Sequence, residues 1–501
     1  MSDTNNQADQ MSNKDGVYDY DVIIFGAGAS GLALASELSK SCKVLVFDKK
    51  KSLSDTTKSW LIPDIVINEG NATDLFDYMI VPKDGGKRGV RRFLANTFTS
   101  ATVQGANIEW DSILQYQFAR DHDLLEYWGK TAKDNKADIL LDCWYQDSFL
   151  TDSQVTINTS KGEFVARLLI DASGGQSPIR SKYSAREHLY WWSVSGAIVK
   201  FPNGLPEGMR VGDYQLWQTF VDTNADEEAS LSDARPVWEY EILDENTAFV
   251  FIFYLGQFRV PQNIMSTMFN HVLKTESTTS SFRDTVIDEI KYGWYPSGGT
   301  RSQQVTRDRV VFVGSAGCWT SPCGWGMSYI IANYKKYAAA LNELVKQDKL
   351  DQAHGAKRKS LSKEGLASIV DLSARAKYQI LMDQVATHFL AFASSNQLNE
   401  FIRLFDPNGE MGNLGPLMCE KLFTLTITEK EAASMLRIII KNIGIKPLLD
   451  TMPKKDYPLV VLLLIESLIA KLLRLLRRLR ILPAEVYNNI ISASGFSLTG
   501  K

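Results

Sequence analysis

The segment from Tyr20 to Leu38, YDVIIFGAGASGLALASEL, constrains this chain more than any other part of the sequence. An apolar, β-branched run at Val22–Phe25 leads directly into three glycines with the spacing GxGxxG. Apolar residues at helical spacing follow, and a second apolar run, KVLVF, occupies residues 43–47. This order predicts a strand, a tight turn, a helix and a second strand of a parallel sheet.

Each glycine of the turn has its own task in such a unit. Gly26 makes the tight turn, Gly28 lets the backbone approach a diphosphate, and Gly31 lets the helix pack closely on the strand. Amides at the start of the helix bind the phosphate charge, and Asp48, at the end of the second strand, is placed to accept hydrogen bonds from a ribose. The segment therefore predicts a Rossmann-type dinucleotide site. The residues expected around the nucleotide also include Ala29, Ser30 and Lys49.

Two later segments favour FAD, because this long dinucleotide needs distant parts of the chain to hold its ribityl chain and ring. RLLIDASGGQSPIRSKY, residues 167–183, reads as a strand, an acid and a turn of small residues. RDRVVFVGSAGCWTSPCGWGMSY, residues 307–329, reads as a short strand, a loop of small residues and the start of a helix that continues through Leu344. The candidate FAD-binding residues in these segments are Asp171, Ala172, Gly174, Gly314, Ser315, Ala316, Gly324, Gly326 and Met327.

The first of these segments resembles the DGxxSxVR fingerprint of the flavin hydroxylase and geranylgeranyl reductase families. The residues in register with that fingerprint are Gly174, Ser177, Ile179 and Arg180, and Ser173 stands in the place of its Asp. The second segment resembles the GGTAGxVHPSTGY loop of lycopene cyclases, with one residue inserted before the proline. Lys58–Asp64, KSWLIPD, is similar to the HTWSFHD segment of the same family.

This resemblance covers about residues 19–345 and implies a glutathione-reductase-like FAD fold. It implies that the helix after the third glycine-rich loop points its N-terminus at the flavin and favours negative charge on the reduced ring. It also implies an apolar substrate of the isoprenoid or polyene kind. Lycopene cyclases carry an acidic FLEET stretch on a strand that reads FVFIFYLGQ here, at residues 249–257, without Glu or Asp.

Several functions remain open on this scaffold. The first is flavin-assisted cyclisation, isomerisation or oxidoreduction of an apolar substrate, and the second is an FAD-dependent monooxygenase or halogenase. A third is a flavin-binding protein without catalysis. The sequence has no second GxGxxG for a separate NADPH domain, so we expect hydride to come from transient NADPH or a partner reductase.

The middle of the chain, residues 191–255, reads as a set of strands. In Trp238–Ile242 the residues alternate, so the aromatic side chains share one face and Glu239 and Glu241 share the other. A similar WxWxIP strand of flavin halogenases faces the pocket, which implies that Trp238 and Tyr240 face inward and that the glutamates are solvated or paired. The alternative is that the glutamates form a general-acid pair. The candidate catalytic residues are Asp64, which matches the acid of HTWSFHD, Trp238 and Tyr240.

The sequence predicts an α/β fold with a Rossmann-type FAD-binding domain, a β-sheet substrate domain and a helical C-terminal region. We expect a tail at 1–18, the FAD-binding domain at 19–185 and 301–350, the sheet domain at 186–300 and the helical region at 351–501. The formal net charge of −3 and the mixed distribution of charges give no field that favours nucleic acid. The five cysteines form no CxxC pair, so we expect neither a disulfide framework nor a metal site.

The C-terminal segment DYPLVVLLLIESLIAKLLRLLRRLRILP, residues 456–483, has the most biased composition in the chain. Leucines fall on one side of a helical wheel and basic residues on the other, which predicts an amphipathic helix at 457–482. An anionic membrane surface fits this pattern, and a core-docking or dimer helix is the alternative. The polar N-terminus lacks a secretory signal, and no apolar run reaches the roughly 18 residues of a spanning helix. We therefore expect a cytoplasmic protein with peripheral membrane contact.

Overall fold

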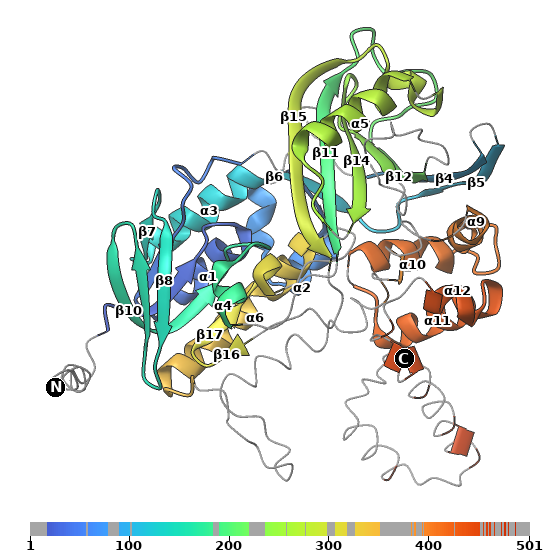
Figure 1. The fold of residues 1–501 in the computed structure, drawn as a ribbon. Helices are drawn as coiled ribbons and strands as arrows, with labels where there is room; N and C mark the ends of the chain where they lie inside the picture. Colours follow the sequence, from blue (N-terminus) through green and yellow to red (C-terminus); the bar gives the residue numbers. More distant parts are fainter. Residues whose placement is uncertain are drawn as a thin grey trace, which may run out of the picture.

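The structure is a computed structural model. It describes residues 18–56, 59–78, 90–100, 103–183, 190–219, 236–256, 258–275, 277–297, 306–317, 326–350, 395–424 and 426–450, with scattered positions between 382 and 486. Two large sheets lie side by side along the molecule, and the C-terminal helices lie next to the second sheet (Figure 1).

The first sheet contains the predicted nucleotide-binding unit. Its strand order is β16 (Thr306–Arg307), β17 (Val310–Phe312), β10 (Gly162–Asp171), β1 (Tyr20–Phe25), β2 (Val44–Phe47) and β7 (Asp138–Leu140), with β9 (Val155–Thr159) and β8 (Tyr145–Leu150) attached at β10. Neighbouring strands from β17 to β7 are parallel. Val22, Ile23 and Ile24 of β1 are completely buried, as expected for a strand covered on both faces.

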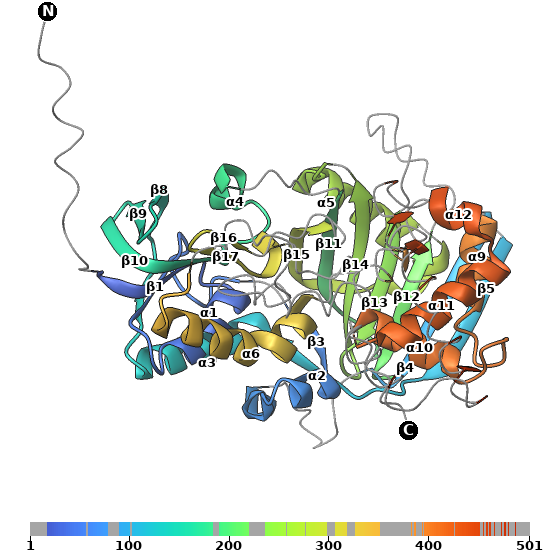
Figure 2. The same cartoon turned by 90° about the horizontal axis from the view of Figure 1, so that it is seen from below.

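Helices and a hairpin cover the two faces of this sheet. On one face α1 (Ala29–Leu38), α3 (Asp121–Asp134) and α6 (Gly326–Lys346) share one apolar core with β1 and β2. Strands β8 and β9 and the short helix α4 (Pro178–Tyr183) enclose a second core on the other face (Figure 2). α6 reaches past Leu344, so the predicted long helix is confirmed.

The second sheet is built around the middle of the chain. Its strand order is β15 (Val286–Ser297), β11 (Tyr190–Lys200), β14 (Thr247–Gly256), β13 (Val237–Ile242), β12 (Asp213–Thr219), β4 (Arg92–Ser100) and β5 (Val103–Asp111). The helix α5 (Gln262–Thr275) and the 3-10 turn η2 (Ser277–Phe282) cover one face. The other face packs on α9 (Ser395–Arg403), α10 (Leu414–Phe423), α11 (Glu429–Asn442) and α12 (Ile445–Asp450).

The second sheet differs from the predicted domain division in one respect. Strands β4 and β5 come from inside the segment 19–185, which the sequence assigned to the FAD-binding domain. They join the second sheet because β4 runs parallel to β12 and Arg92 forms an ion pair of 2.6 Å with the buried Asp213. A small two-stranded sheet of β3 (Ser59–Pro63) and β6 (Tyr116–Arg120) connects them to the first sheet.

The predicted α/β fold class, with a helical C-terminal region, is confirmed. The buried Glu420 of α10 holds this region on the second sheet, since its carboxylate accepts hydrogen bonds from Trp110, Tyr116 and the backbone that links them. Among the residues described here, none of the helices is long and apolar enough to pass through a bilayer. Most of the predicted helix at 457–482 lies outside the described residues.

Candidate functional site

The turn between β1 and α1 contains three glycines with two different roles. Two of them are required by close packing, and the third leaves open space beside the backbone. Gly26 has a φ of +112°, and a Cβ on it would lie 2.4 Å from the carbonyl oxygen of Ala172. A Cβ on Gly31 would lie 1.9 Å from the carbonyl oxygen of Gly26. Gly28 is different, because it has an extended backbone and a Cβ there would meet no atom within 4 Å. The missing side chain of Gly28 therefore leaves an open cradle at the N-terminus of α1.

Asp48 ties the end of β2 to this turn. Its Oδ2 accepts a hydrogen bond of 2.7 Å from the amide of Ala27, and its Oδ1 accepts one of 2.9 Å from the amide of Lys50. Lys49 is exposed, and its ammonium lies 5.9 Å from the ring centroid of Trp144. Ala29 and Ser30 form the first turn of α1 beside the cradle.

Asp171 ends β10, and its side chain is bound within its own turn, so its predicted contact with the cofactor stays a prediction. The carboxylate is completely buried and accepts hydrogen bonds from the amide and hydroxyl of Ser173 and from the hydroxyl of Ser177. Burial raises the pKa of Asp171, and these hydrogen bonds oppose the rise. The acid therefore shapes its own turn. Its neighbour Ala172 lies against the backbone of Gly26, and a Cβ on Gly174 would meet no atom within 4 Å.

The third predicted segment, residues 307–329, also reaches the first turn of α1. Gly314 has a φ of +57°, and a Cβ on it would lie 2.3 Å from the Ser30 hydroxyl of α1. Ser315 and Ala316 follow in the short turn η3 (Gly314–Gly317), and Gly326 and Met327 begin α6 as buried residues. Gly324 lies outside the described residues.

Arg180 belongs to the site, although it was not among the predicted cofactor residues. Its guanidinium is buried and donates a hydrogen bond of 2.6 Å to the carbonyl oxygen of Ala316, so it joins α4 to η3. The amide of Val313 also donates to the carbonyl oxygen of Asp171, at 2.9 Å. The match of Arg180 to the DGxxSxVR fingerprint was the signal that identified it. All three glycine-rich segments therefore meet at the carboxyl ends of β1, β10 and β17.

The residues present fit FAD. The cradle at Gly28 and the amides of the first turn of α1 suit a diphosphate, since helix N-termini bind anions. Asp48 lies where a ribose is bound in such folds, and the family resemblance implies that η3 and the start of α6 would hold the flavin half. Within the described residues, no group of three His, Cys, Asp or Glu side chains is arranged to hold a metal ion.

Asp64 is the first residue of α2 (Asp64–Glu69), directly after β3. Its Oδ1 accepts a hydrogen bond of 2.9 Å from the side-chain amide of Gln117, and its backbone amide donates to Gln115. A carboxylate in the first turn also favours the helix dipole. These contacts give Asp64 a role in fixing the junction between β6 and α2, and its catalytic role remains a prediction.

The expectation that Trp238 and Tyr240 face the pocket is wrong. Both rings point from β13 into the core under α5 and η2, where Tyr240 lies 4.9 Å and Trp238 5.6 Å from the ring of Phe282. Trp238 has no exposed surface. The expectation that Glu239 and Glu241 are solvated is also wrong, because both are buried on the opposite face of the strand. Strand alternation was right, but α5 covers the aromatic side.

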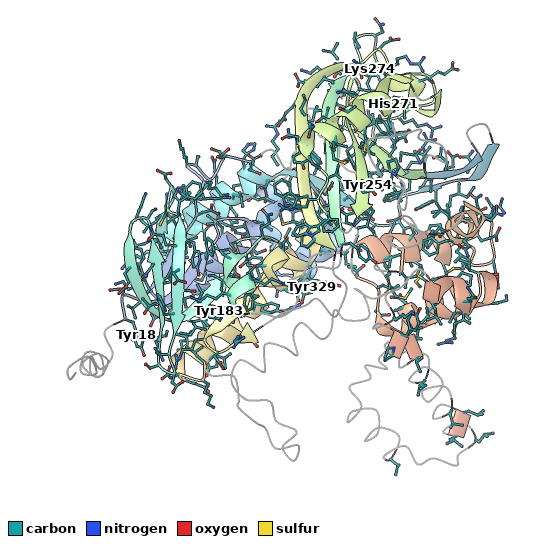
Figure 3. The ribbon with its side chains drawn as sticks, in the orientation of Figure 1. Tyr18, Tyr183, Tyr254, His271, Lys274 and Tyr329 are labelled. Carbon is teal, nitrogen blue, oxygen red and sulfur yellow. The ribbon has the colours of Figure 1, made fainter. Side chains whose placement is uncertain are left out.

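The second sheet approaches the first one where the end of β15 and the start of β11 meet the turn after β10. A Cβ on Gly175, in the turn after β10, would lie 2.9 Å from Pro296 of β15 and 3.2 Å from Trp191 of β11. Figure 3 labels Tyr254 on β14 and Tyr329 on the first turn of α6, one from each of the two sheet units. The second sheet is thus attached beside the nucleotide site.

Comparisons with known proteins agree with this fold. Residues 24–74 match the family model of the NAD(P)-binding Rossmann-like domain. The chain is similar in structure to a geranylgeranyl bacteriochlorophyll reductase-like protein from Thermoplasma acidophilum, with a TM-score of 0.59 and 12% identity over 84% of this chain and 99% of that one. A search of curated proteins finds no relative that matches this sequence.

Two further solved structures show the same architecture. Halogenase PltM, in complex with phloroglucinol and FAD, aligns with a TM-score of 0.53 and 14% identity over 94% of this chain and 95% of that one. A flavoprotein/dehydrogenase from Cytophaga hutchinsonii gives a TM-score of 0.53 and 14% identity over 81% and 93% of the two chains. The chain therefore has the fold of FAD-dependent oxidoreductases, and FAD, the cofactor predicted from the sequence, is the ligand named with one of these structures.

Proposed function

We propose that this protein is an FAD-dependent enzyme that acts on an apolar, isoprenoid or polyene-like substrate. The observation that carries the proposal is the open space at Gly28, at a helix N-terminus where three glycine-rich segments converge. When bound, FAD supplies redox chemistry or, once reduced, negative charge beside the substrate. Cyclisation, isomerisation and oxidoreduction are all compatible with that chemistry.

An apolar substrate is supported by aromatic residues on the face of the second sheet that lies opposite α5 and packs in part on the C-terminal helices. Five aromatic side chains form a row there, in which each ring lies close to the next. The distances between successive ring centroids are 4.7, 4.8, 5.7 and 6.3 Å. We call this row the aromatic ladder; it consists of Phe249, Phe251, Phe253, Trp192 and Tyr295. Three of its members, Phe249, Phe253 and Tyr295, are only half-buried. The ladder ends at Tyr295, next to Pro296, which contacts the FAD-binding unit.

The lycopene cyclase-like reaction is the finer part of this proposal. Strand β14 corresponds to the strand that carries the FLEET acid in that family, and within Thr247–Gly256 it has no acidic residue. A proton donor would therefore have to come from another element. Electrons would come from NADPH that binds transiently or from a partner reductase.

A second candidate function is an FAD-dependent monooxygenase or halogenase, and the likeness to halogenase PltM over nearly the whole of both chains favours it. Oxygen uptake by the NADPH-reduced protein, measured with and without a lipid extract, separates the two. Uptake that depends on the extract supports oxygenation, whereas product formation without uptake supports isomerisation or cyclisation. A flavin-binding protein without catalysis would show neither.

The first experiment is an absorption spectrum of the purified protein, followed by mass analysis of the ligands extracted from it. The proposal expects FAD in stoichiometric amount and an isoprenoid-like lipid as co-purifying ligand. A colourless protein that does not take up added FAD would contradict it.

We also propose contact with an anionic membrane surface through the C-terminal segment 457–482. The side chains of Val461, Ile465, Leu472, Leu475 and Leu479 are each about half exposed, and their spacing puts them on one helical stripe. Basic residues occur at 471, 474, 477, 478 and 480, next to these positions in the sequence, and they suit anionic headgroups. Such a surface would bring the enzyme to an apolar substrate dissolved in the bilayer.

A further inference from the structure

Two carboxyl groups lie next to each other inside the second sheet. Glu239 and Glu241 of β13 are 6% and 4% exposed and point to the same face, opposite Trp238 and Tyr240. Tyr214 of β12 is paired in register with Glu241, and its hydroxyl donates a hydrogen bond of 3.0 Å to Oε2 of Glu239. The pair therefore consists of one carboxyl with a tyrosine donor and one without.

Glu241 accepts no hydrogen bond and forms no ion pair within the described part of the chain. Burial of a carboxyl without a partner is costly, and the cost is smaller when the group is neutral. Burial raises the pKa of Glu241 to about 8. At neutral pH Glu241 is thus predominantly a protonated acid, with a hydrogen-bond donor that no described residue uses.

The surrounding ionisable groups leave this donor available. On the same face lie Tyr214, whose pKa burial raises far above its usual value, and Cys419 of α10, whose pKa burial also raises. Glu420 of α10 binds the segment from Trp110 to Tyr116 instead. Lys291 of β15 forms its ion pair with Glu289, and Arg92 pairs with Asp213 on the opposite face of the sheet.

Glu241 lies at the far end of the aromatic ladder. In the register of β13 and β14 it is opposite Phe249, the first ring of the ladder. From Phe249 to Leu255 the strand advances six residues, or about 20 Å, toward the end of the sheet that contacts Gly175. The ladder thus connects an acidic end with the end beside the FAD-binding unit.

We propose that Glu241 binds the oxygen-bearing end of a long apolar substrate whose chain lies along the aromatic ladder toward the flavin. A neutral carboxyl in apolar surroundings is a strong donor to a carbonyl or hydroxyl oxygen. The ligand class is an isoprenoid or similar chain with an oxygen at the end that does not react. This inference rests on the proposed function, because it places the ligand in the same enzyme.

The test uses the full-length, FAD-loaded protein and two radiolabelled probes presented in detergent micelles. One is the isoprenoid ketone geranylgeranylacetone, and the other is the hydrocarbon with the same chain and no oxygen. We expect the ketone to bind about tenfold more tightly, as one hydrogen bond in a buried site supplies. Glu241→Leu should abolish this preference, whereas Glu241→Gln should keep it, because the amide still donates.

The pH dependence gives a second readout. Deprotonation removes the donor, so the preference of the wild-type protein for the ketone should disappear as the pH rises through about 8. The Glu241→Gln variant has no proton to lose and should keep its preference. Tyr240→Phe, on the opposite face of β13, is the matched control and should behave as the wild type.

The outcomes separate this inference from the proposed function. Equal binding of ketone and hydrocarbon, or a preference that survives Glu241→Leu, overturns the role of Glu241 and leaves the apolar substrate standing. Failure of the FAD-loaded protein to bind either probe overturns both. Retention of FAD and an unchanged unfolding temperature show that a variant is folded.

Discussion

The Asp48 carboxylate accepts a hydrogen bond of 2.7 Å from the backbone amide of Ala27, so the end of β2 holds the glycine turn after β1. This contact fixes the end of β2 relative to the turn after β1 in the protein without ligand. A second hydrogen bond from the amide of Lys50 holds the carboxylate in place.

Removal of this carboxylate should weaken both the turn and the binding of FAD. Hydrogen bonds to a charged group contribute about 1.5–3 kcal/mol, so Asp48→Ala should lower the free energy of unfolding by about that amount. FAD affinity should fall at least about tenfold, as measured by titration of the apoprotein with FAD. Asp55→Ala, at an exposed position nearby, is the control. Unchanged affinity in Asp48→Ala would show that the contact does not shape the site.

Glu420 should be essential for the packing of the C-terminal helices. It accepts hydrogen bonds from Trp110 at 3.0 Å, from Tyr116 at 3.1 Å and from two backbone amides. Glu420→Ala would leave these buried donors without a partner, at a cost of about 3 kcal/mol or more in urea unfolding. Glu400→Ala removes an exposed glutamate that pairs with Arg403 and should cost less than about 1 kcal/mol. Equal losses in the two variants would contradict this role.

The protonation of Glu241 should appear in the pH dependence of stability. Its pKa is raised to about 8 in the folded protein, whereas an unfolded glutamate titrates near 4.3. Between these values the folded state binds more protons than the unfolded state, so stability falls as the pH rises, by up to about 1.4 kcal/mol per pH unit. Glu241→Gln should remove this decline.

Urea unfolding of both proteins at about pH 5 and pH 8 measures that difference. At the lower pH the two should be similar in stability, and at the higher pH the variant should be the more stable one. Parallel pH profiles would mean that Glu241 is ionised in the folded protein at neutral pH.

The apolar stripe of the C-terminal segment should mediate membrane binding. The full-length protein should co-sediment with vesicles rich in phosphatidylserine and much less with pure phosphatidylcholine, and salt should weaken the binding. Leu472, Leu475 and Leu479 are each more than half exposed, so their replacement by serine should release the protein with little change in stability. If the variant still sediments, or the wild type never does, the stripe serves another purpose, such as a dimer contact.

The first sheet was readable from the sequence because its signals are local. The run Val22–Phe25, the glycine spacing and the acid at Asp48 lie within one short β-α-β unit, and each of them has its expected place. The match to the DGxxSxVR fingerprint also pointed to Arg180, which joins α4 to η3.

The second sheet was harder to read because its partners are distant in sequence. The pairing of β4 with β12 joins residues more than a hundred positions apart, and no local pattern announces it. The alternation on β13 identified two faces of the strand correctly. Only the position of α5, which follows later in the chain, decides that Trp238 is packed away and that Glu241 faces the aromatic ladder.

Asp171 illustrates a different limit. An acid after a buried strand suggests a ligand contact, but Ser173 and Ser177, two and six residues further on, satisfy its carboxylate inside the turn. The sequence contains these serines, yet only the backbone path of the turn brings them to the carboxylate.

Gly28 offers the most direct test of the central claim, which is that the turn after β1 binds the diphosphate of FAD. A side chain at Gly28 meets no protein atom within 4 Å, and the backbone there is extended, so Gly28→Val should fold normally. Gly31→Ala, whose Cβ would lie 1.9 Å from the carbonyl oxygen of Gly26, should instead destabilise the apoprotein. The measurement is flavin absorbance per protein after saturation with FAD and gel filtration. Our account predicts a folded Gly28→Val protein that retains less than about a tenth of the wild-type flavin, because the side chain fills the diphosphate cradle. A Gly28→Val protein that keeps its full complement of flavin would contradict it.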